Sequence, residues 1–234
     1  MKSEEFELVK SKNLKDLIRT FSEVKEGPRI DPYLSIQIDN IVMVLNDLGQ
    51  SEVKFEKNIR KLLDLINSDE VKWFKQGVEI LGKVLGFEAI QPKGDTVLDG
   101  VWRLRDKFLG FEINVEGICR AIVESEACRQ IHGHKKWIQE NVPFPGGATI
   151  DVIIISKKNI TSEDSLSQAS GLFHINTSDI REIALKTTIM LREILSVFRK
   201  IQRQDQIFKI ITLEKLTYRD IEEYFKTQLL DEFF

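Results

Sequence analysis

The sequence predicts an α/β fold in which a central mixed β-sheet is flanked by helices and preceded by an α-helical N-terminal region. From Asp69 onward, helical and strand-like segments follow one another in the order α-β-β-β-α-β-α-β, which is typical of such folds. The run Val152–Ile155 contains only β-branched residues, as expected for a strand buried on both faces. Because the sequence changes character at Ser68-Asp69, we expect a helical N-terminal region over residues 1–67 and an α/β domain over residues 68–234.

The N-terminal region carries apolar residues at helical spacing and no catalytic pattern. A first helical segment, with an apolar face between Leu8 and Phe21, is expected to break at Gly27-Pro28. Two more helices are expected over Tyr33–Leu48 and, after a start marked by Ser51 with Lys54, over Phe55–Ile66.

The first half of the α/β domain contains one helix and three strand-like runs. Ser68 or Asp69 is expected to cap the helix, which runs to Leu85 and stops at Gly86. The three expected strands are Phe87–Gln91, Val97–Leu104 and Phe108–Val115, the last two joined by a hairpin turn at Arg105-Asp106-Lys107.

The second half adds the remaining elements. Asp179 with Glu182 has the spacing of a capping box, and Thr217 is placed to cap a last helix. The expected elements are a helix from about Arg120 to Glu140, a strand at Thr149–Ser156, a polar loop at Asn159–Asn176, a helix at Ile180–Gln204 and a strand at Ile207–Ile211.

The composition narrows the classes of protein to consider. A net charge of −3 is unlike that of a dedicated nucleic-acid coat protein, so affinity for DNA is expected to be focused in a local cleft or supplied partly by a partner. The sequence shows no bilayer-spanning apolar stretch and no signal-peptide pattern, so we expect no membrane partner and a cytoplasmic location. Cys119 and Cys128 are too few for a disulfide framework or a zinc quartet.

Two acidic residues carry the chemistry that the sequence predicts. Asp99 lies at the start of one expected strand, and Glu112 lies on its hairpin partner. Carboxylates on adjacent strands suit Mg²⁺, with substrate phosphate and water completing the octahedron. Because side chains alternate along a strand, Glu112, Asn114 and Glu116 are expected to share a face, with Arg103 near Asp99. The alternative interpretation is a polar turn at Asp99 and a solvated edge residue at Glu112.

A helix downstream has a polar face of its own. Gln130, Gly133, His134 and Trp137 stand at i, i+3, i+4 and i+7, which places them on one side of a helix. Gln130 and His134 would present hydrogen-bond donors that line the active site or contact a phosphate backbone. His132 and His134 point to different faces of a helix, so a zinc site built from this pair is not expected.

These segments together resemble a known nuclease family. Gly94–Trp102, followed by Phe111-Glu112-Ile113-Asn114, resembles the signature of PD-(D/E)XK, or restriction-endonuclease-like, nucleases. In that family an Asp precedes a hairpin whose second strand carries (D/E)-X-K. The segment Arg129–Trp137 resembles the glutamine-bearing helix of a subset of these nucleases, and the resemblance covers roughly Asp69–Ile211.

The resemblance implies a restriction-endonuclease-like core that hydrolyses DNA phosphodiester bonds with Mg²⁺ or Mn²⁺. It gives metal-binding roles to Asp99, Glu112 and the backbone carbonyl of Ile113, and makes Asn114 and Gln130 further catalytic positions. Arg103 and His134 are then expected to bind substrate, while Glu79 resembles an additional acidic residue of some members.

One position departs from the family pattern. Asn114 stands where the family has a lysine that orients the attacking water and stabilises phosphate charge. A neutral Asn cannot supply that charge, so Arg103, Lys107 or a neighbouring residue is expected to supply it from another backbone position.

Two alternatives to an active nuclease are kept. The first is a catalytically inactive nuclease-fold domain that binds nucleic acid or a protein partner in a larger assembly, which the substitution at Asn114 favours. The second is a purely structural or interaction module, a homodimer included, which the acidic composition favours.

Overall fold

A computed structural model describes residues 31–48, 51–92, 98–114, 122–123, 125–143, 145–157, 160–161, 172–198 and 204–226 of the chain. The main sheet has five strands in the order β1-β2-β3-β5-β7, and β4 and β6 pair separately. The strands are β1 (Glu88–Ile90), β2 (Gly100–Leu104), β3 (Lys107–Asn114), β4 (Ile122–Val123), β5 (Thr149–Ser156), β6 (Ile160–Thr161) and β7 (Phe173–Asn176). The helices are α2 (Pro32–Leu48), α3 (Glu52–Ile66), α4 (Val71–Val84), α5 (Ser125–Asn141), α7 (Thr177–Phe198), α8 (Gln204–Leu213) and α9 (Tyr218–Lys226).

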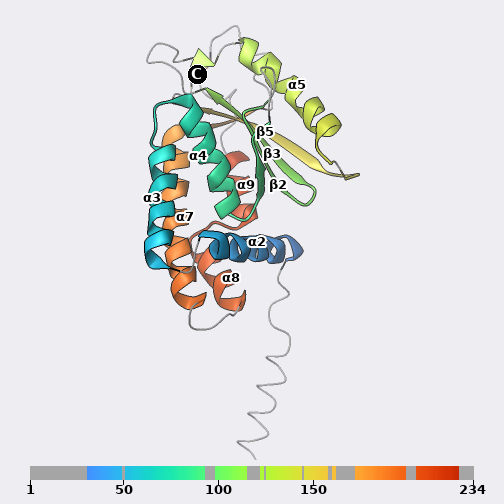
Figure 1. The fold of residues 1–234 in the computed structure, drawn as a ribbon. Coiled ribbons are helices and arrows are strands. Elements are labelled where there is room, and N and C mark those ends of the chain that lie inside the picture. The colour runs from blue at the N-terminus through green and yellow to red at the C-terminus, as the bar shows by residue number, and fades with distance from the viewer. Residues whose placement is uncertain are drawn as a thin grey trace, which may run out of the picture.

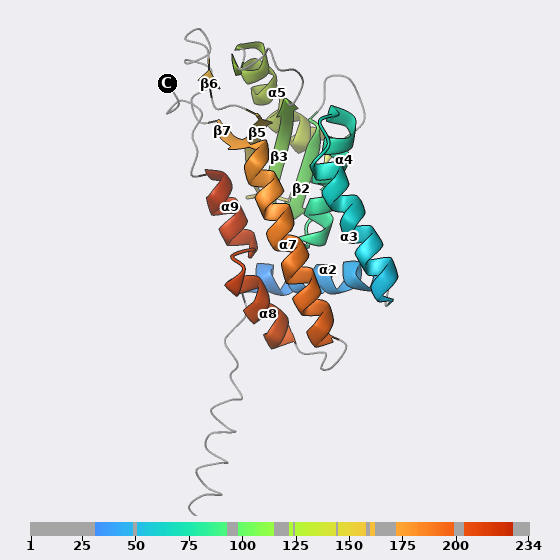
Figure 2. The same ribbon diagram turned by 90° about the vertical axis from the view of Figure 1, so that its left-hand side faces the viewer.

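The sheet is mixed, which confirms the predicted α/β class. β1, β2 and β3 form an antiparallel meander, whereas β5 runs parallel to β3 and β7 runs parallel to β5. The turn between β2 and β3 is tight, and Arg105 adopts a left-handed backbone conformation there with φ 58°. Since β3, β5 and β7 all point the same way, their carboxyl ends meet at one edge of the sheet, the upper end in Figures 1 and 2.

The two faces of the sheet bury different side chains. On one face, Trp102 and Phe111 pack with residues of α4, α7 and α9 in the larger hydrophobic cluster. On the other face, Val101 and Phe108 pack with Ile138 of α5 in a smaller cluster. Figures 1 and 2 show α5 on the side of the sheet opposite α4 and α7. The side chains of β2 and β3 therefore alternate between these two clusters, as the period of a strand requires.

The N-terminal helices belong to the larger cluster. Ile38 and Ile41 of α2 and Phe55 and Ile59 of α3 are buried together with side chains of the sheet and of α7. Gln37 also ties α2 to distant parts of the chain, because its Nε2 donates to the carbonyls of Leu85 and Leu216. The division expected at residues 67 and 68 therefore does not separate two hydrophobic cores. The helix expected around Leu8–Phe21 lies outside the described residues.

Some helix starts differ from the predicted positions. Ser51 caps α3 as expected, since its side chain accepts the N–H of Lys54. Neither Ser68 nor Asp69 caps α4; the cap position is Glu70, whose side chain makes no capping bond. The helix α7 begins at Thr177, and Asp179 closes its first turn by accepting the backbone N–H of Asn176.

Three predictions in the second half of the chain are wrong. Residues 122–123, expected in the helix from about Arg120 to Glu140, form β4 and pair with β6, and α5 begins only at Ser125. Residues 207–211 lie in α8 and not in a strand, because Ile207, Ile210 and Ile211 are buried at the spacing of a helix. The segment expected to be a loop contains β7, which pairs with β5 and buries His174. A histidine inside a four-residue strand hides the apolar pattern that would have indicated it.

The length and the composition of the helices determine whether they could span a membrane. Within the described residues, none of them combines the length and the apolar composition that crossing a bilayer would need.

Candidate active site at the carboxyl end of the sheet

Asp99 is fixed by the backbone of the neighbouring strand. It directly precedes β2, and its N–H donates to the carbonyl of Phe111 at 2.9 Å. The N–H of Ile113 donates to Oδ2 of Asp99 at 2.8 Å. Because both bonds reach β3, the carboxylate is held across the start of the hairpin at the level of Glu112.

Glu112 is covered by a residue of α5. The Nε2 of His134 lies 3.0 Å from Oε2 of Glu112, and the two side chains are 6% and 20% exposed. Gly110 allows this helix to approach, since a Cβ there would lie 3.2 Å from Cδ1 of Ile138 and 3.1 Å from Leu98. The structure thus brings His134 to Glu112, on the helix face that its spacing predicted.

The surroundings of Asp99, including the charge of Glu112, change the pKa of its carboxyl group. Burial raises the pKa of Asp99 above its ordinary value, and the negative charge of Glu112 raises it further. The hydrogen bonds from Lys75 and from the N–H of Ile113 act in the opposite direction on the same pKa, without cancelling the rise. Asp99 and Glu112 therefore form a site where the negative charge is only partly compensated by the protein.

Lys75 of α4 is the residue that sequence reasoning missed. Its ammonium pairs with Oδ1 of Asp99, and the two side chains are 24% and 13% exposed. The helix is anchored next to this contact by Phe74, which is buried in the larger cluster. Trp102 anchors α4 further along, because its Nε1 donates to the carbonyl of Val78 at 3.2 Å. The sequence feature that could have indicated Lys75 is its position next to the apolar face of the helix that precedes Asp99.

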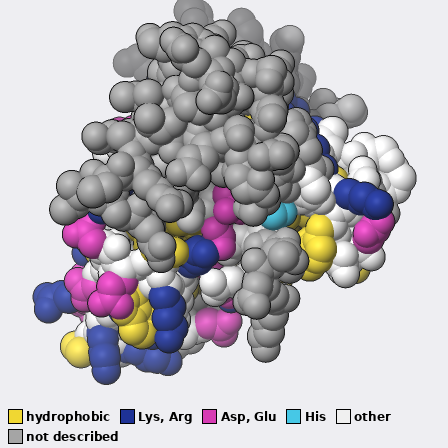
Figure 3. All heavy atoms as spheres, turned by 90° about the horizontal axis from the view of Figure 1, so that it is seen from above, with side chains coloured by type: hydrophobic (Ala, Val, Ile, Leu, Met, Phe, Trp, Pro, Cys, Tyr) yellow, Lys and Arg dark blue, Asp and Glu magenta, His cyan; other side chains and the backbone are white. Residues whose placement is uncertain are grey.

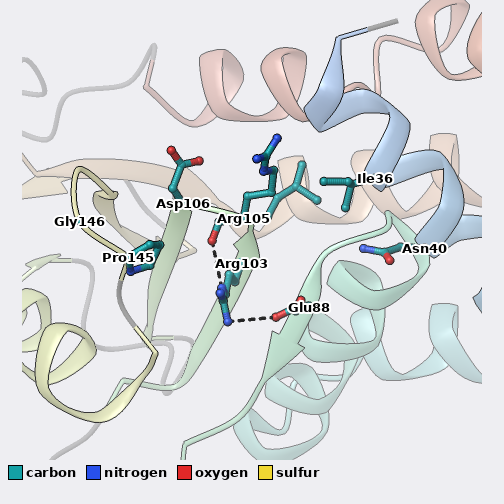
Figure 4. A pocket seen from close by; sticks show the side chains of 9 residues that line it. Ile36, Asn40, Glu88, Arg103, Arg105, Asp106, Pro145 and Gly146 are labelled. Carbon is teal, nitrogen blue, oxygen red and sulfur yellow. Dashed lines mark hydrogen bonds and ion pairs between the residues drawn. The ribbon is translucent and has the colours of Figure 1, made fainter.

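Arg103 lies elsewhere, which corrects its expected place near Asp99. Four residues of strand separate the two positions, or about 13 Å at the usual rise. Arg103 lines a pocket beside the hairpin turn, where Nε donates to the carbonyl of Arg105 at 3.0 Å and Nη1 lies 3.4 Å from Glu88 (Figure 4). Strand alternation gave the correct face for Arg103, which stacks over Phe108, but not its position along the strand.

Other residues of the prediction also lie apart from the two carboxylates or outside the description. Lys107 lies 3.9 Å from Glu222 of α9, at the hairpin end of the sheet. Glu79 pairs with Lys83 on its own helix at 2.6 Å. The backbone of Asn114 pairs in register with Ser156 of β5, and Gln130 lies on α5 one turn before His134. Their side chains, together with all of Glu116, Cys119 and the side chain of Cys128, lie outside the described residues.

More cations lie at the same end of the sheet. Lys157 follows β5 directly, and its Nζ lies 2.9 Å from Oδ1 of Asp69, which Arg181 of α7 also approaches at 4.0 Å. In Figure 3, which views the molecule from above, acidic side chains lie beside basic side chains and a histidine. This end of the sheet therefore combines carboxylates with lysine and arginine side chains.

The donor set at this edge suits a hard cation only in part. Among the described residues, no group of three or more His, Cys, Asp or Glu side chains could hold a metal ion. A cation at Asp99 and Glu112 would complete its shell with backbone, water or substrate oxygens, which is the usual arrangement for Mg²⁺. Carboxylate oxygens are the kind of ligand that such an ion prefers, whereas a softer metal would need nitrogen or sulfur ligands.

In comparisons with known proteins, no family model, no curated protein and no solved structure matches this chain.

Proposed function

We propose that the protein is a metal-dependent phosphodiesterase that hydrolyses nucleic acid, with DNA as the substrate class that the PD-(D/E)XK resemblance implies. The observation that carries the proposal is the pair Asp99 and Glu112, which lie directly before β2 and on the adjacent β3, with side chains 13% and 20% exposed. The charge of Glu112 raises the pKa of Asp99. Such a pair is a binding site for one hard divalent cation such as Mg²⁺. When bound, this cation supplies Lewis-acid activation of water and of the phosphate.

A third oxygen donor is available from the backbone. The N–H of Ile113 points toward Asp99, as its bond to Oδ2 requires. In a β-ladder the N–H and the C=O of one residue serve the same neighbouring strand. The carbonyl of Ile113 accordingly faces the side of Asp99, which lies directly before the start of β2. We propose that Asp99, Glu112 and this carbonyl would act as the three protein ligands that the resemblance implies.

Two residues support the carboxylates. His134 holds Glu112 in place through its Nε2, and such supporting contacts orient metal ligands. Lys75 carries the positive charge that the neutral Asn114 cannot supply, since its ammonium already lies at Asp99. We assign to Lys75 the stabilisation of the phosphate charge that develops in the reaction.

The order of elements supports the same function. An acidic residue precedes a hairpin, the second strand of the hairpin carries Glu112, and a helix with His134 leads to the parallel strand β5. Lys157 and Arg181 lie at the same end of the sheet, and we propose that they contact backbone phosphates on either side of the scissile bond.

A second candidate function is binding without cleavage. It is favoured by a specific observation: Lys75 and His134 already occupy Asp99 and Glu112, so the carboxylates are partnered by protein groups. In that case the domain would bind nucleic acid or a protein partner through the same edge of the sheet.

A cleavage assay separates the two candidates. Single-stranded and duplex DNA are incubated with the wild-type protein, with and without Mg²⁺ or Mn²⁺, beside Asp99→Ala and the control Asp151→Ala. Asp151 is a suitable control because it lies at the start of β5, paired with Lys226, at the far end of the sheet. Metal-dependent cleavage that is lost only in Asp99→Ala supports the nuclease, whereas DNA binding with no cleavage supports the second candidate.

A further inference from the structure

We propose that Lys75 is a built-in counter-ion that occupies the coordination position of the divalent cation, so that cation binding requires Lys75 to leave Asp99. The inference rests on the proposed function, because it concerns the same two carboxylates. It goes further by assigning a control of metal affinity to one side chain of α4.

The first argument is that both oxygens of Asp99 are occupied. Oδ2 accepts the backbone N–H of Ile113 at 2.8 Å, a bond that belongs to the fixed frame of the hairpin. Oδ1 pairs with the ammonium of Lys75. Oδ1 is the oxygen that the frame leaves available for a ligand, and the lysine holds it.

The second argument is electrostatic. An ammonium and a divalent cation cannot share one carboxylate oxygen at contact distance, because like charges repel strongly at a site screened from water. The negative charge of Glu112 adds to that of Asp99, so a positive charge at this place is favourable. Glu112 itself contacts His134. Lys75 therefore stabilises the metal-free site and competes with the cation for the same oxygen.

The third argument is that Lys75 is able to move. Its side chain is 24% exposed, whereas that of Asp99 is 13% exposed. A lysine has a flexible stem of four carbons, and it can carry its charge to another partner without displacement of the helix. A substrate phosphate beside the cation would be such a partner, so that release of Lys75 from Asp99 would bring the charge to the phosphate.

The test is a direct measurement of cation affinity in the full-length protein. Mn²⁺ is titrated into the wild type, Lys75→Met and Lys83→Met at constant ionic strength, and binding is followed by calorimetry. Lys83 is the matched control, because it lies on the same helix and pairs only with Glu79 among the contacts described. We expect Lys75→Met to bind Mn²⁺ at least about 5-fold more tightly than the wild type, the lower end of ordinary coupling between two ligands.

Two further variants keep the test decisive. Lys75→Arg retains the charge and is expected to bind Mn²⁺ with nearly wild-type affinity, whereas Lys75→Gln removes the charge and replaces Lys75→Met if that variant does not fold. In that event the inference requires that Lys75→Gln binds Mn²⁺ more tightly than the wild type.

The possible outcomes separate the inference from the proposed function. Equal or weaker Mn²⁺ binding by Lys75→Met, with clear binding by the wild type, overturns the inference and leaves the metal site standing. Absence of Mn²⁺ binding in the wild type and in every variant overturns both. Tighter binding by both Lys75→Met and Lys83→Met would show a general charge effect and would also overturn the inference.

Discussion

The Nε2 of His134 lies 3.0 Å from Oε2 of Glu112, which links the helix α5 to the strand β3 at the edge where the parallel strands end. The histidine side chain is 6% exposed, so the contact is shielded from water. An imidazole that holds a carboxylate in this way limits the positions that the carboxylate can adopt. This contact therefore restricts the orientation of the Glu112 carboxylate.

Replacement of His134 by Ala is expected to weaken Mn²⁺ binding by about 10- to 100-fold, the usual loss when a residue supporting a metal ligand is removed. Calorimetry measures the change, and a denaturation curve checks that the variant remains folded. Gln139→Ala on the exposed side of the same helix is the control. Unchanged affinity in His134→Ala would show that Glu112 needs no support.

Asp99→Asn is expected to raise the free energy of unfolding at neutral pH. The folded state raises the pKa of Asp99, through burial and the charge of Glu112, so ionisation of this group destabilises the fold. This destabilisation is absent below the ordinary pKa of 3.8 and develops as the pH rises through the raised pKa. The difference between variant and wild type in urea unfolding should therefore disappear as the pH falls toward 3.8.

Asp69 is a control, because the shift of its pKa has the opposite sign to that of Asp99. The hydrogen bond and the charge of Lys157 lower the pKa of Asp69, so its ionised form favours the folded state above the ordinary pKa, and this contribution is lost as the pH falls through the lowered pKa. Asp69→Asn should consequently not stabilise the protein at neutral pH. Equal behaviour of the two variants would contradict the electrostatic description of Asp99.

Lys75→Met is expected to lower the rate of DNA cleavage by about 10²- to 10³-fold, as removal of one charge that stabilises a transition state usually does. Lys83→Met should cleave at the wild-type rate. The double variant Lys75→Met with Asn114→Lys should recover part of the lost rate, because it places a lysine where the nucleases that the sequence resembles have one. Single-turnover kinetics measures all four proteins, and no recovery would show that residue 114 does not face the reacting phosphate.

Deletion of residues 1–56 is expected to abolish cooperative unfolding. It removes Ile38, Ile41 and Phe55 from the cluster that also contains the sheet. Urea denaturation followed by circular dichroism tests this, with deletion of residues 1–30 as the control that leaves every described contact in place. A cooperative transition in the longer deletion would show that the α/β part folds alone.

A single substitution tests the shared core without a deletion. Ile38 of α2 has no exposed surface, and truncation of such a side chain costs about 2–5 kcal/mol of stability. Ile38→Ala should therefore destabilise the whole protein, which the midpoint of urea unfolding measures. The exposed Met43 on the same helix provides the control, since Met43→Ala should change the midpoint little.

Local patterns in the sequence were sufficient for much of the fold. The strand Thr149–Ser156 was predicted with its observed bounds, because an uninterrupted β-branched run has few alternatives. The caps at Ser51 and Thr217 were predicted because each capping bond lies within four residues. The run Ile207–Ile211 was assigned wrongly, since a short apolar run has no period that separates strand from helix.

The sequence predicts the two carboxylates of the candidate site but not the lysine that pairs with Asp99. Asp99 and Glu112 are neighbours through a hairpin, and a hairpin is a local structure. The contact between Lys75 and Asp99 depends on how α4 packs against β2, through Trp102 and the carbonyl of Val78. No spacing in the sequence reports that packing, so the charge was sought at Arg103, which points to the hairpin pocket.

The most direct test of the central claim is the position of a bound cation. Crystals grown with Mn²⁺ should show an anomalous diffraction peak bonded to one carboxylate oxygen of Asp99 and one of Glu112, with the ammonium of Lys75 moved away from Asp99. A peak elsewhere, or no peak at a saturating concentration of Mn²⁺ with Lys75 still paired to Asp99, would contradict the assignment of this edge of the sheet as a metal-dependent nuclease site.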